Sequence, residues 1–242
     1  MTITLYQFEI SPFADKVRRA MRWKGVDFVT AEVRVTEQRR LRRLSPTGKL
    51  PVIVHEGRTI ADSTDILRFL DQRFPEKPLR PDDPRDAAWA VILEDWADES
   101  LYFFDLTMRS WPQNRTWFVD DLLRHQPAGL VRPMLARAIP GAIAKVARTQ
   151  GLGRKTPEAV AADLAALYDA LDTLLSGRDW LAGPRLSSAD VAVRAMVNVL
   201  DRTVEGEALR AARPALDAWS RRVDAEAPAE GVSAPRKAGL SP

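Results

Sequence analysis

The residues that could carry out chemistry are limited first by what the chain lacks. Among its 242 residues there is no cysteine, and histidine occurs only at His55 and His125. Disulfide bonds, cysteine-ligated zinc, iron–sulfur clusters and a protein thiol nucleophile are therefore excluded. Two histidines this far apart do not form a metal-binding motif, so we expect no metal. Any sulfur chemistry must come from a ligand.

Ser11 is the hydroxyl group with the most informative neighbours. It precedes Pro12, a residue favoured in the first turn of a helix, and an apolar helical stretch that ends at Gly25. Free backbone N–H groups and the positive end of the helix dipole favour an anion at such a position. The same position is typical of a plain helix cap, so both interpretations stay open.

The elements that must position Ser11 alternate between strand and helix over the first 75 residues. Apolar residues recur at every second position from Val29 to Val35, which is typical of a strand. Glu56-Gly57 predicts a hairpin turn, and Ser63 is expected to cap a helix that closes before Pro75. The pattern predicts a βαβαββα domain over residues 1–75, with strands at 2–6, 27–35, 51–55 and 58–61 and helices at 12–24, 36–44 and 63–74.

Beyond residue 75 the sequence changes character. Four prolines between Pro75 and Pro84 exclude regular structure, so residues 76–85 are predicted to be a linker. Helical spacing without a strand pattern then predicts an all-helical domain over residues 86–225. Residues 226–242 are rich in Ala, Pro and Glu and are expected to be disordered. Helix starts are indicated at Asp83-Pro84, Thr156-Pro157, Ser187 and Pro214.

Charge is nearly balanced over the chain but not along it. Lys and Arg number 36 against 33 Asp and Glu, a net charge of +3, yet the segment from Arg34 to Lys49 is strongly basic. Such a patch suits nucleic acid, an anionic small ligand or a solvated helix face. No aromatic or glycine-rich RNA motif accompanies it, so we expect no nucleic-acid partner. We find neither a signal peptide nor an apolar run of membrane-spanning length and expect a cytoplasmic protein.

Four motifs in this order resemble those of the cytosolic glutathione transferases. Ser11–Ala20 (SPFADKVRRA) is similar to the start of the first helix in the omega, zeta and theta classes, and Gly48–Ile53 (GKLPVI) to a segment with a cis-proline. Ala61-Asp62-Ser63 is similar to the family's acidic-serine pair, and Ser187-x-x-Asp190 to its capping box. The resemblance covers nearly the whole chain. It implies a thioredoxin-like N-terminal domain, an all-helical second domain and a homodimer.

The resemblance also implies a site for glutathione. Glutathione would be a co-substrate, and no tightly bound cofactor is expected. Ser11 would donate its hydroxyl to the thiolate, and a cis Leu50-Pro51 bond would present backbone to the tripeptide as an added strand does. Asp62 and Ser63 would hold the γ-glutamyl group; the alternatives are a surface acid and a helix cap. The implied set is Ser11 as catalytic residue and, for glutathione binding, Phe13, Lys49, Leu50, Pro51, Asp62 and Ser63, with Arg39 as a further cation near the glycyl carboxylate.

The resemblance implies a glutathione transferase with a catalytic serine. Such an enzyme would conjugate glutathione to an apolar electrophile, which is a detoxifying reaction. The pocket for this electrophile would lie in the helical domain, opposite Ser11. Aromatic residues at helical spacing also suit a hydrophobic core, so their assignment stays open. The candidates for the pocket are Tyr102, Phe103, Trp111 and Trp117, with Phe104 beside them.

Some residues depart from the glutathione transferase motifs or indicate another role. Gln7 stands where some classes have a catalytic tyrosine. Gln150–Arg154 (QGLGR) is similar to a metaxin-like or Fax-like branch, which implies the alternative of a non-catalytic interaction or scaffold protein. Asp190 is expected to be structural, because at the third helical position it bonds back to Ser187. His125 is expected at the surface or in a loop.

Overall fold

The N-terminal part of the chain is a four-stranded mixed sheet with helices against it. The computed structural model describes residues 2–126, 129 and 131–229. The sheet has the order β2-β1-β3-β4, with β1 parallel to β2 and antiparallel to β3. The βαβαββα prediction is confirmed. Its elements are β1 (Ile3–Gln7), α1 (Pro12–Lys24), β2 (Phe28–Glu32), α2 (Gln38–Leu44), β3 (Val52–His55), β4 (Arg58–Ala61) and α3 (Ser63–Arg73).

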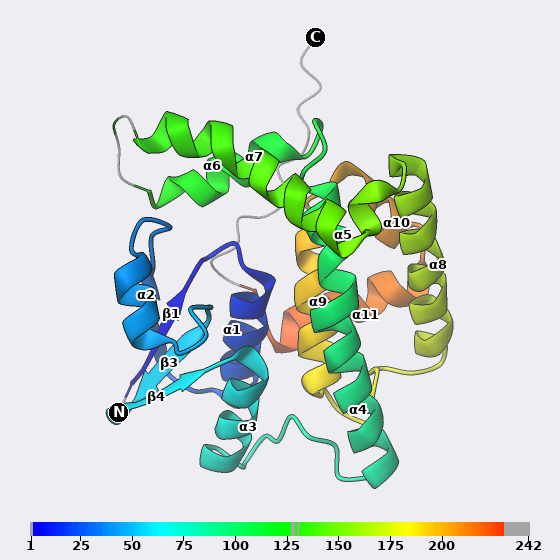
Figure 1. The fold of residues 1–242 in the computed structure, drawn as a ribbon. Coiled ribbons are helices and arrows are strands. Elements are labelled where there is room, and N and C mark those ends of the chain that lie inside the picture. The colour runs from blue at the N-terminus through cyan, green and yellow to red at the C-terminus, as the bar shows by residue number, and fades with distance from the viewer. Residues whose placement is uncertain (1, 127–128, 130, 230–242) are drawn as a thin grey trace.

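Helix α1 lies at the centre of the molecule, between the sheet and the second domain (Figure 1). It packs on α3 from its own domain and on α9 from the other. Nine of its thirteen residues are buried, and these include four charged ones, Asp15, Lys16, Arg18 and Arg19. Gly25 ends the helix with φ of 68°, a left-handed conformation that glycine adopts without a steric penalty.

In the described part of the second domain, all regular secondary structure is helical. Helix α4 passes directly into a five-residue π-helical turn, η1, and then into α5, so the aromatic residues Trp89, Trp96 and Phe103 lie on two helices joined by a widened turn. None of the described helices is both long and apolar enough to cross a membrane. The elements are α4 (Pro84–Trp96), η1 (Ala97–Leu101), α5 (Tyr102–Met108), α6 (Arg115–Arg124), α7 (Val131–Gln150), η2 (Leu152–Arg154), α8 (Pro157–Leu175), α9 (Ser188–Leu200), α10 (Val204–Ala211) and α11 (Pro214–Glu226).

Helix α9 is the core of this domain, and Asp190 fixes its start. The predicted capping box is present, since Oδ2 of Asp190 accepts from the Ser187 backbone at 2.9 Å and from the Ser187 hydroxyl at 2.7 Å. Oδ1 accepts from the Leu181 N–H at 2.9 Å and from the Trp219 indole at 2.8 Å. Burial raises the pKa of Asp190, and these donors oppose the rise. This one carboxylate therefore joins α9, α11 and the preceding loop.

The structure corrects several boundaries. The second strand is shorter than expected and ends at Glu32, while the segment after it forms no ladder beyond the bond from Val33 N–H to Gln7 C=O. The predicted linker is irregular but held in place: Leu79 is buried, and its N–H donates to Asp71 at 2.9 Å. Helix α11 continues through Glu226, and Ala227 behind it is fully buried. The rest of the expected disordered tail, residues 230–242, lies outside the described residues.

Replacing Asp190 by alanine should destabilise the fold without touching ligand binding. Four buried donors would lose their acceptor, so we expect a loss of about 3–5 kcal/mol in the free energy of unfolding. Asp83→Ala removes an exposed cap of α4 that accepts two backbone N–H bonds, and should cost only about 1 kcal/mol. Urea denaturation measures both. A stable Asp190→Ala protein that has lost affinity for glutathione would contradict the structural assignment.

Candidate glutathione site

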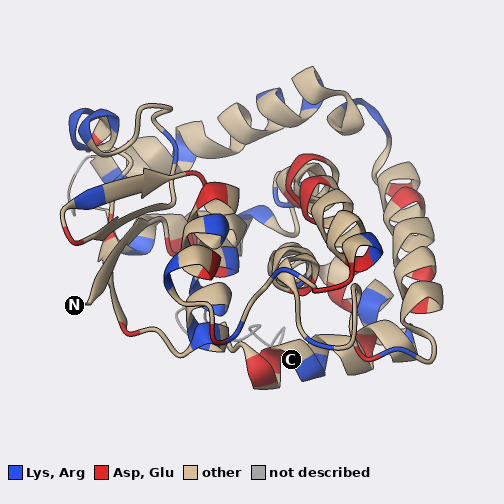
Figure 2. Cartoon of the chain, turned by 90° about the horizontal axis from the view of Figure 1, so that it is seen from below, with Lys and Arg blue, Asp and Glu red and all other residues tan. Residues whose placement is uncertain are grey.

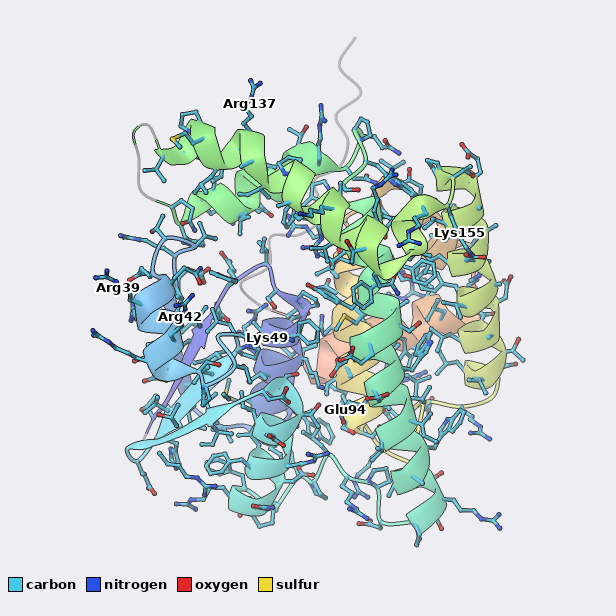
Figure 3. All side chains as sticks on the ribbon, viewed as in Figure 1. Arg39, Arg42, Lys49, Glu94, Arg137 and Lys155 are labelled. Carbon is cyan, nitrogen blue, oxygen red and sulfur yellow. The ribbon has the colours of Figure 1, made fainter. Side chains whose placement is uncertain are left out.

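A cleft of about 1240 Å³ runs between the N-terminal domain and helix α4. Figure 3 shows Lys49, beside the sheet, and Glu94, on α4, at its two sides. The loops after β1 and before β3, the start of α3 and the π-helical turn all contribute to its walls. Predicted site residues that line it are Ser11, Phe13, Lys49, Leu50, Pro51, Asp62, Ser63, Tyr102 and Phe103.

Ser11 occupies the N-cap position of α1 but does not use its side chain as a cap. Its carbonyl accepts from the Asp15 N–H at 3.0 Å, while its hydroxyl makes no capping hydrogen bond. Ser11 is half-buried, lines the cleft and precedes the free N–H groups of the first turn of α1. Because the cap is made by backbone alone, the hydroxyl is available to a bound anion.

Phe13 and Tyr102 form an aromatic contact across the two domains. Their ring centroids are 4.8 Å apart with an interplanar angle of 62°, an edge-to-face arrangement. Phe103 continues this contact, with its ring centroid 5.6 Å from that of Tyr102. All three rings line the cleft near Ser11, so the wall facing the serine is apolar there.

The loop before β3 brings backbone to the same cleft. The Leu50-Pro51 peptide bond is cis, as the resemblance implied. The loop ahead of it is held by the Ser45 hydroxyl, which accepts from the Lys49 N–H at 3.2 Å. Leu50 is half-buried and lies beside the start of β3, where an extended peptide could run along the chain.

Asp62, and not Ser63, caps helix α3. Oδ1 of Asp62 accepts from the N–H groups of Thr64 and Asp65 at 2.9 and 3.3 Å, while Ser63 is the first helical residue. The expectation that Ser63 is the N-cap is therefore wrong, because Ser63 is already the first helical residue and the aspartate before it accepts from the second and third N–H groups of the helix. Asp62 has φ of 76°, which costs energy for a residue with a side chain and is characteristic of functional turns. Ser63 is buried and lines the cleft without serving as the cap.

Other candidates lie away from the cleft. Trp117 stacks under the Arg202 guanidinium, 4.2 Å from its ring centroid, and Trp111 packs against the core, so neither lines the cleft. Phe104 is buried. On α2, Leu41 and not Arg39 contributes to the wall. The aromatic spacing could not separate these cases, since η1 and the end of α5 change the direction of the side chains.

A charged cluster beneath the cleft was missed by the sequence analysis. Lys16 is fully buried, and its ammonium lies 2.7 Å from Glu94 and 2.7 Å from Asp98. It also donates to the Thr64 hydroxyl at 3.1 Å, which in turn donates to Glu94 at 2.9 Å. Lys16 shares a helix face with the apolar residues Phe13 and Ala20, and a lysine on that face was the available signal.

Asp98 is the least well satisfied member of this cluster. Its Oδ1 is buried and has no hydrogen-bond partner among the described residues. Burial raises the pKa of Asp98 to about 6, although the Lys16 ammonium lowers it. Asp98 belongs to the π-helical turn η1, a feature frequent at functional sites.

Neither histidine lines the cleft. His55 is buried between the rings of Phe69 and Phe74. His125 ends α6, as expected for a loop residue, and its Nε2 lies 2.6 Å from the Glu9 carboxylate in the loop before Ser11. It therefore ties α6 to the N-terminal domain and offers no base to the site.

Comparison with known families identifies the chain. The description "Glutathione S-transferase, N-terminal domain" matches residues 5–78, and "Glutathione S-transferase, C-terminal domain" matches residues 140–226. The chain belongs to the cytosolic glutathione transferase family.

Individual relatives and one solved structure are similar to most of the chain. Isoprene-epoxide–glutathione S-transferase of Rhodococcus sp. is 26% identical over 191 residues, 76% of this chain and 78% of that protein. FtsZ-localized protein A of Caulobacter vibrioides is 30% identical over 203 residues, 82% of this chain and 77% of that protein. The structure of rice GST1 in complex with glutathione is 26% identical with a TM-score of 0.66, covering 98% of this chain and 94% of that one.

Because the pKa of Asp98 is raised, the free energy of unfolding should change with pH in the mildly acidic range. Its pKa is about 6 in the folded chain against an ordinary 3.8, so the folded state holds the proton more tightly. The contribution, about 3 kcal/mol, is full below about pH 4 and lost as the pH rises through about 6. Asp98→Asn should abolish this part of the dependence, and the exposed Asp95→Asn should not. Urea denaturation across this range measures it; parallel curves for wild type and Asp98→Asn would contradict the assignment.

Proposed function

We propose that this protein conjugates glutathione to an apolar electrophile and that Ser11 stabilises the glutathione thiolate. The observation that carries the proposal is that Ser11, whose hydroxyl makes no capping hydrogen bond, lines a cleft shared with the cis Leu50-Pro51 bond and the start of α3. The family membership and the glutathione-bound rice structure support glutathione as the ligand.

Glutathione would bind as an extended tripeptide along the start of β3. The backbone of Leu50 would pair with the cysteinyl backbone, as in strand addition. The γ-glutamyl carboxylate would accept from the Ser63 hydroxyl and from the N-terminal end of α3, and its ammonium would face Asp62. Lys49, exposed at the opposite end, would meet the glycyl carboxylate.

Ser11 would act on the ionisation of the thiol. A hydrogen bond to a charged acceptor contributes about 1.5–3 kcal/mol, which lowers a thiol pKa near 8.5 by about one to two units. The thiolate would then attack the electrophilic carbon, forming a C–S bond while the electron pair of the breaking bond goes to the leaving group or to the epoxide oxygen. No imidazole is needed, because the proton leaves to solvent before the attack.

The electrophile would sit against the aromatic rings of Phe13, Tyr102 and Phe103. These rings bury an apolar substrate beside the sulfur, which supplies proximity and orientation rather than acid–base chemistry. Trp111 and Trp117 are left out of this proposed pocket because they do not line the cleft.

A cytoplasmic homodimer is the proposed form of the protein. Helix α4 exposes Trp89 and Ile92, with 37% and 56% of their surfaces accessible, and neither residue lines the cleft. Apolar side chains of this size on one helix support a subunit interface, and dimers are typical of the family.

One relative favours a second function, that of an interaction protein without catalysis. The similarity to FtsZ-localized protein A extends over most of both chains, whereas the comparisons give the metaxin-like resemblance no support. Retention on immobilised glutathione separates the two functions: a catalytic transferase is retained and eluted by free glutathione, and a protein that uses the fold only for interaction passes through.

The Ser63 hydroxyl tests the binding geometry. Ser63→Ala should weaken glutathione binding by about 1–3 kcal/mol, because a charged carboxylate would lose a donor. The fold should keep its stability, since Asp62 and not Ser63 caps α3. Titration calorimetry measures the affinity, with Thr59→Ala on β4 as an exposed control. Unchanged affinity would remove Ser63 from the site.

Position 11 tests the chemistry. Ser11→Ala should raise the pKa of bound glutathione by about one unit or more, seen as loss of thiolate absorbance near neutral pH, and should slow conjugation more than it weakens binding. Ser11→Cys should form a mixed disulfide with oxidised glutathione, because a cysteine at a helix N-terminus has a low pKa. This chain has no other cysteine, so mass spectrometry reads the adduct directly. A folded Ser11→Cys protein without adduct would mean that position 11 does not face the sulfur.

A further inference from the structure

Helix α7 buries fewer of its residues than the neighbouring helices α5 and α6 do. Of its twenty residues only Ala147 is buried. It lies beside α6 and against α5, across the end of the helical domain seen at the top of Figure 1. Its outer side is therefore free within the described structure and takes no part in the glutathione cleft.

The charge on this helix has one sign. α7 carries Arg132, Arg137, Lys145 and Arg148 and no acidic residue. The nearest carboxylates along the chain are Asp121 and Glu158. In Figure 2 the ribbon of α7 carries blue segments and no red one, whereas red segments lie along α8, and Figure 3 shows Arg137 pointing away from the molecule.

A shallow groove of about 520 Å³ lies at the C-terminal end of α7. Its walls combine three cations with small residues that leave the backbone accessible. A Cβ at Gly141 would meet no atom within 4 Å, so the groove is open there. It is lined by Gly141, Ala144, Lys145, Arg148, Thr149 and Arg154.

The QGLGR segment builds this groove. Gly151 has φ of 122°, a conformation that residues with a side chain rarely adopt, and a Cβ at Gly153 would come within 2.9 Å of the α7 backbone. The two glycines let the chain fold back tightly, and Nε of Arg154 donates to the Arg148 carbonyl at 2.8 Å. The turn thus fixes the Arg154 guanidinium as a third cation beside Lys145 and Arg148.

Apolar side chains accompany the cations on the outer side. Met134 is 70% exposed, the most exposed large apolar residue of the described chain, and Val131 and Val146 are exposed as well. Residues 134, 138, 141, 145 and 148 follow one another at intervals of four and three, so they share a single helix face. That face runs from a methionine through alanine and glycine to a lysine and an arginine.

We propose that the outer face of α7, with the basic groove at its end, docks onto the surface of an anionic phospholipid bilayer. Phosphate headgroups would occupy the groove between Lys145, Arg148 and Arg154, and Met134 would enter the headgroup region. A helix that is basic and exposes apolar side chains is typical of a surface-bound, non-spanning segment. Nucleic acid is disfavoured, because α7 has no aromatic residue on which a base could stack.

The test is binding of the full chain to vesicles of phosphatidylcholine, alone or mixed with phosphatidylserine. The wild type should cosediment with the anionic vesicles and be released by salt. One cation near an anionic surface contributes about a fivefold preference, so the triple variant Lys145→Gln, Arg148→Gln, Arg154→Gln should bind about a hundredfold more weakly. Met134→Ser should weaken binding further without changing its salt dependence.

A matched variant controls for net charge. Arg85→Gln, Arg178→Gln, Arg221→Gln removes three exposed cations from other elements and should bind like the wild type. Glutathione turnover should be unchanged in both triple variants, since none of these residues lines the cleft. Three outcomes would overturn the proposal. The two triple variants could bind equally, the wild type could bind both kinds of vesicle equally, or it could bind only free glycerophosphate or an oligonucleotide.

Discussion

The buried charges of α1 are the constraint on which the rest of this structure depends. Asp15, Lys16, Arg18 and Arg19 are withdrawn from water at the centre of the molecule, where an unpaired charge would cost several kcal/mol. Each is therefore paired, and the partners come from both domains. Arg19 donates to Asp224 and to the Ala227 carbonyl of the C-terminal helix region. The pKa of Asp15 is lowered despite its burial, because Arg19 and Arg18 favour its charged form.

This network sets where Ser11 lies. Arg18 donates to the buried Gln7 side chain at 2.7 Å and to the Glu9 carbonyl, which holds the loop that precedes the serine. Gln7 thus has a structural partner, in keeping with the absence of a catalytic tyrosine at that position. Lys16, on the other side of the helix, fixes the N-terminal half of α1 against the cleft-lining acids of α4 and η1. A site between two domains gains its geometry from charges that neither domain could bury alone.

Helix α7 shows the opposite physical situation. Its charges are solvated and have one sign, so they impose little on the fold and leave a field directed outward. The cleft and this face are built from different parts of the chain, and one can be altered without the other. A single fold can in this way carry a ligand cleft and a separate functional surface.

Local signals in the sequence determined the order of strands and helices in the N-terminal domain and the starts of α4, α8, α9 and α11 in the helical domain. The capping residues Asp83, Thr156 and Ser187 act within three or four positions of themselves, so their effect can be deduced from sequence alone. The cis bond before Pro51 followed only from the family resemblance. What the sequence could not determine depends on distant partners: Lys16 meets Asp98 from 82 positions away, and Arg19 meets Asp224 from 205. Only the tertiary structure decided that a lysine on an apolar face is buried and paired, and that Trp117 stacks on Arg202, because these outcomes are set by which surfaces exclude water once segments distant in sequence pack together.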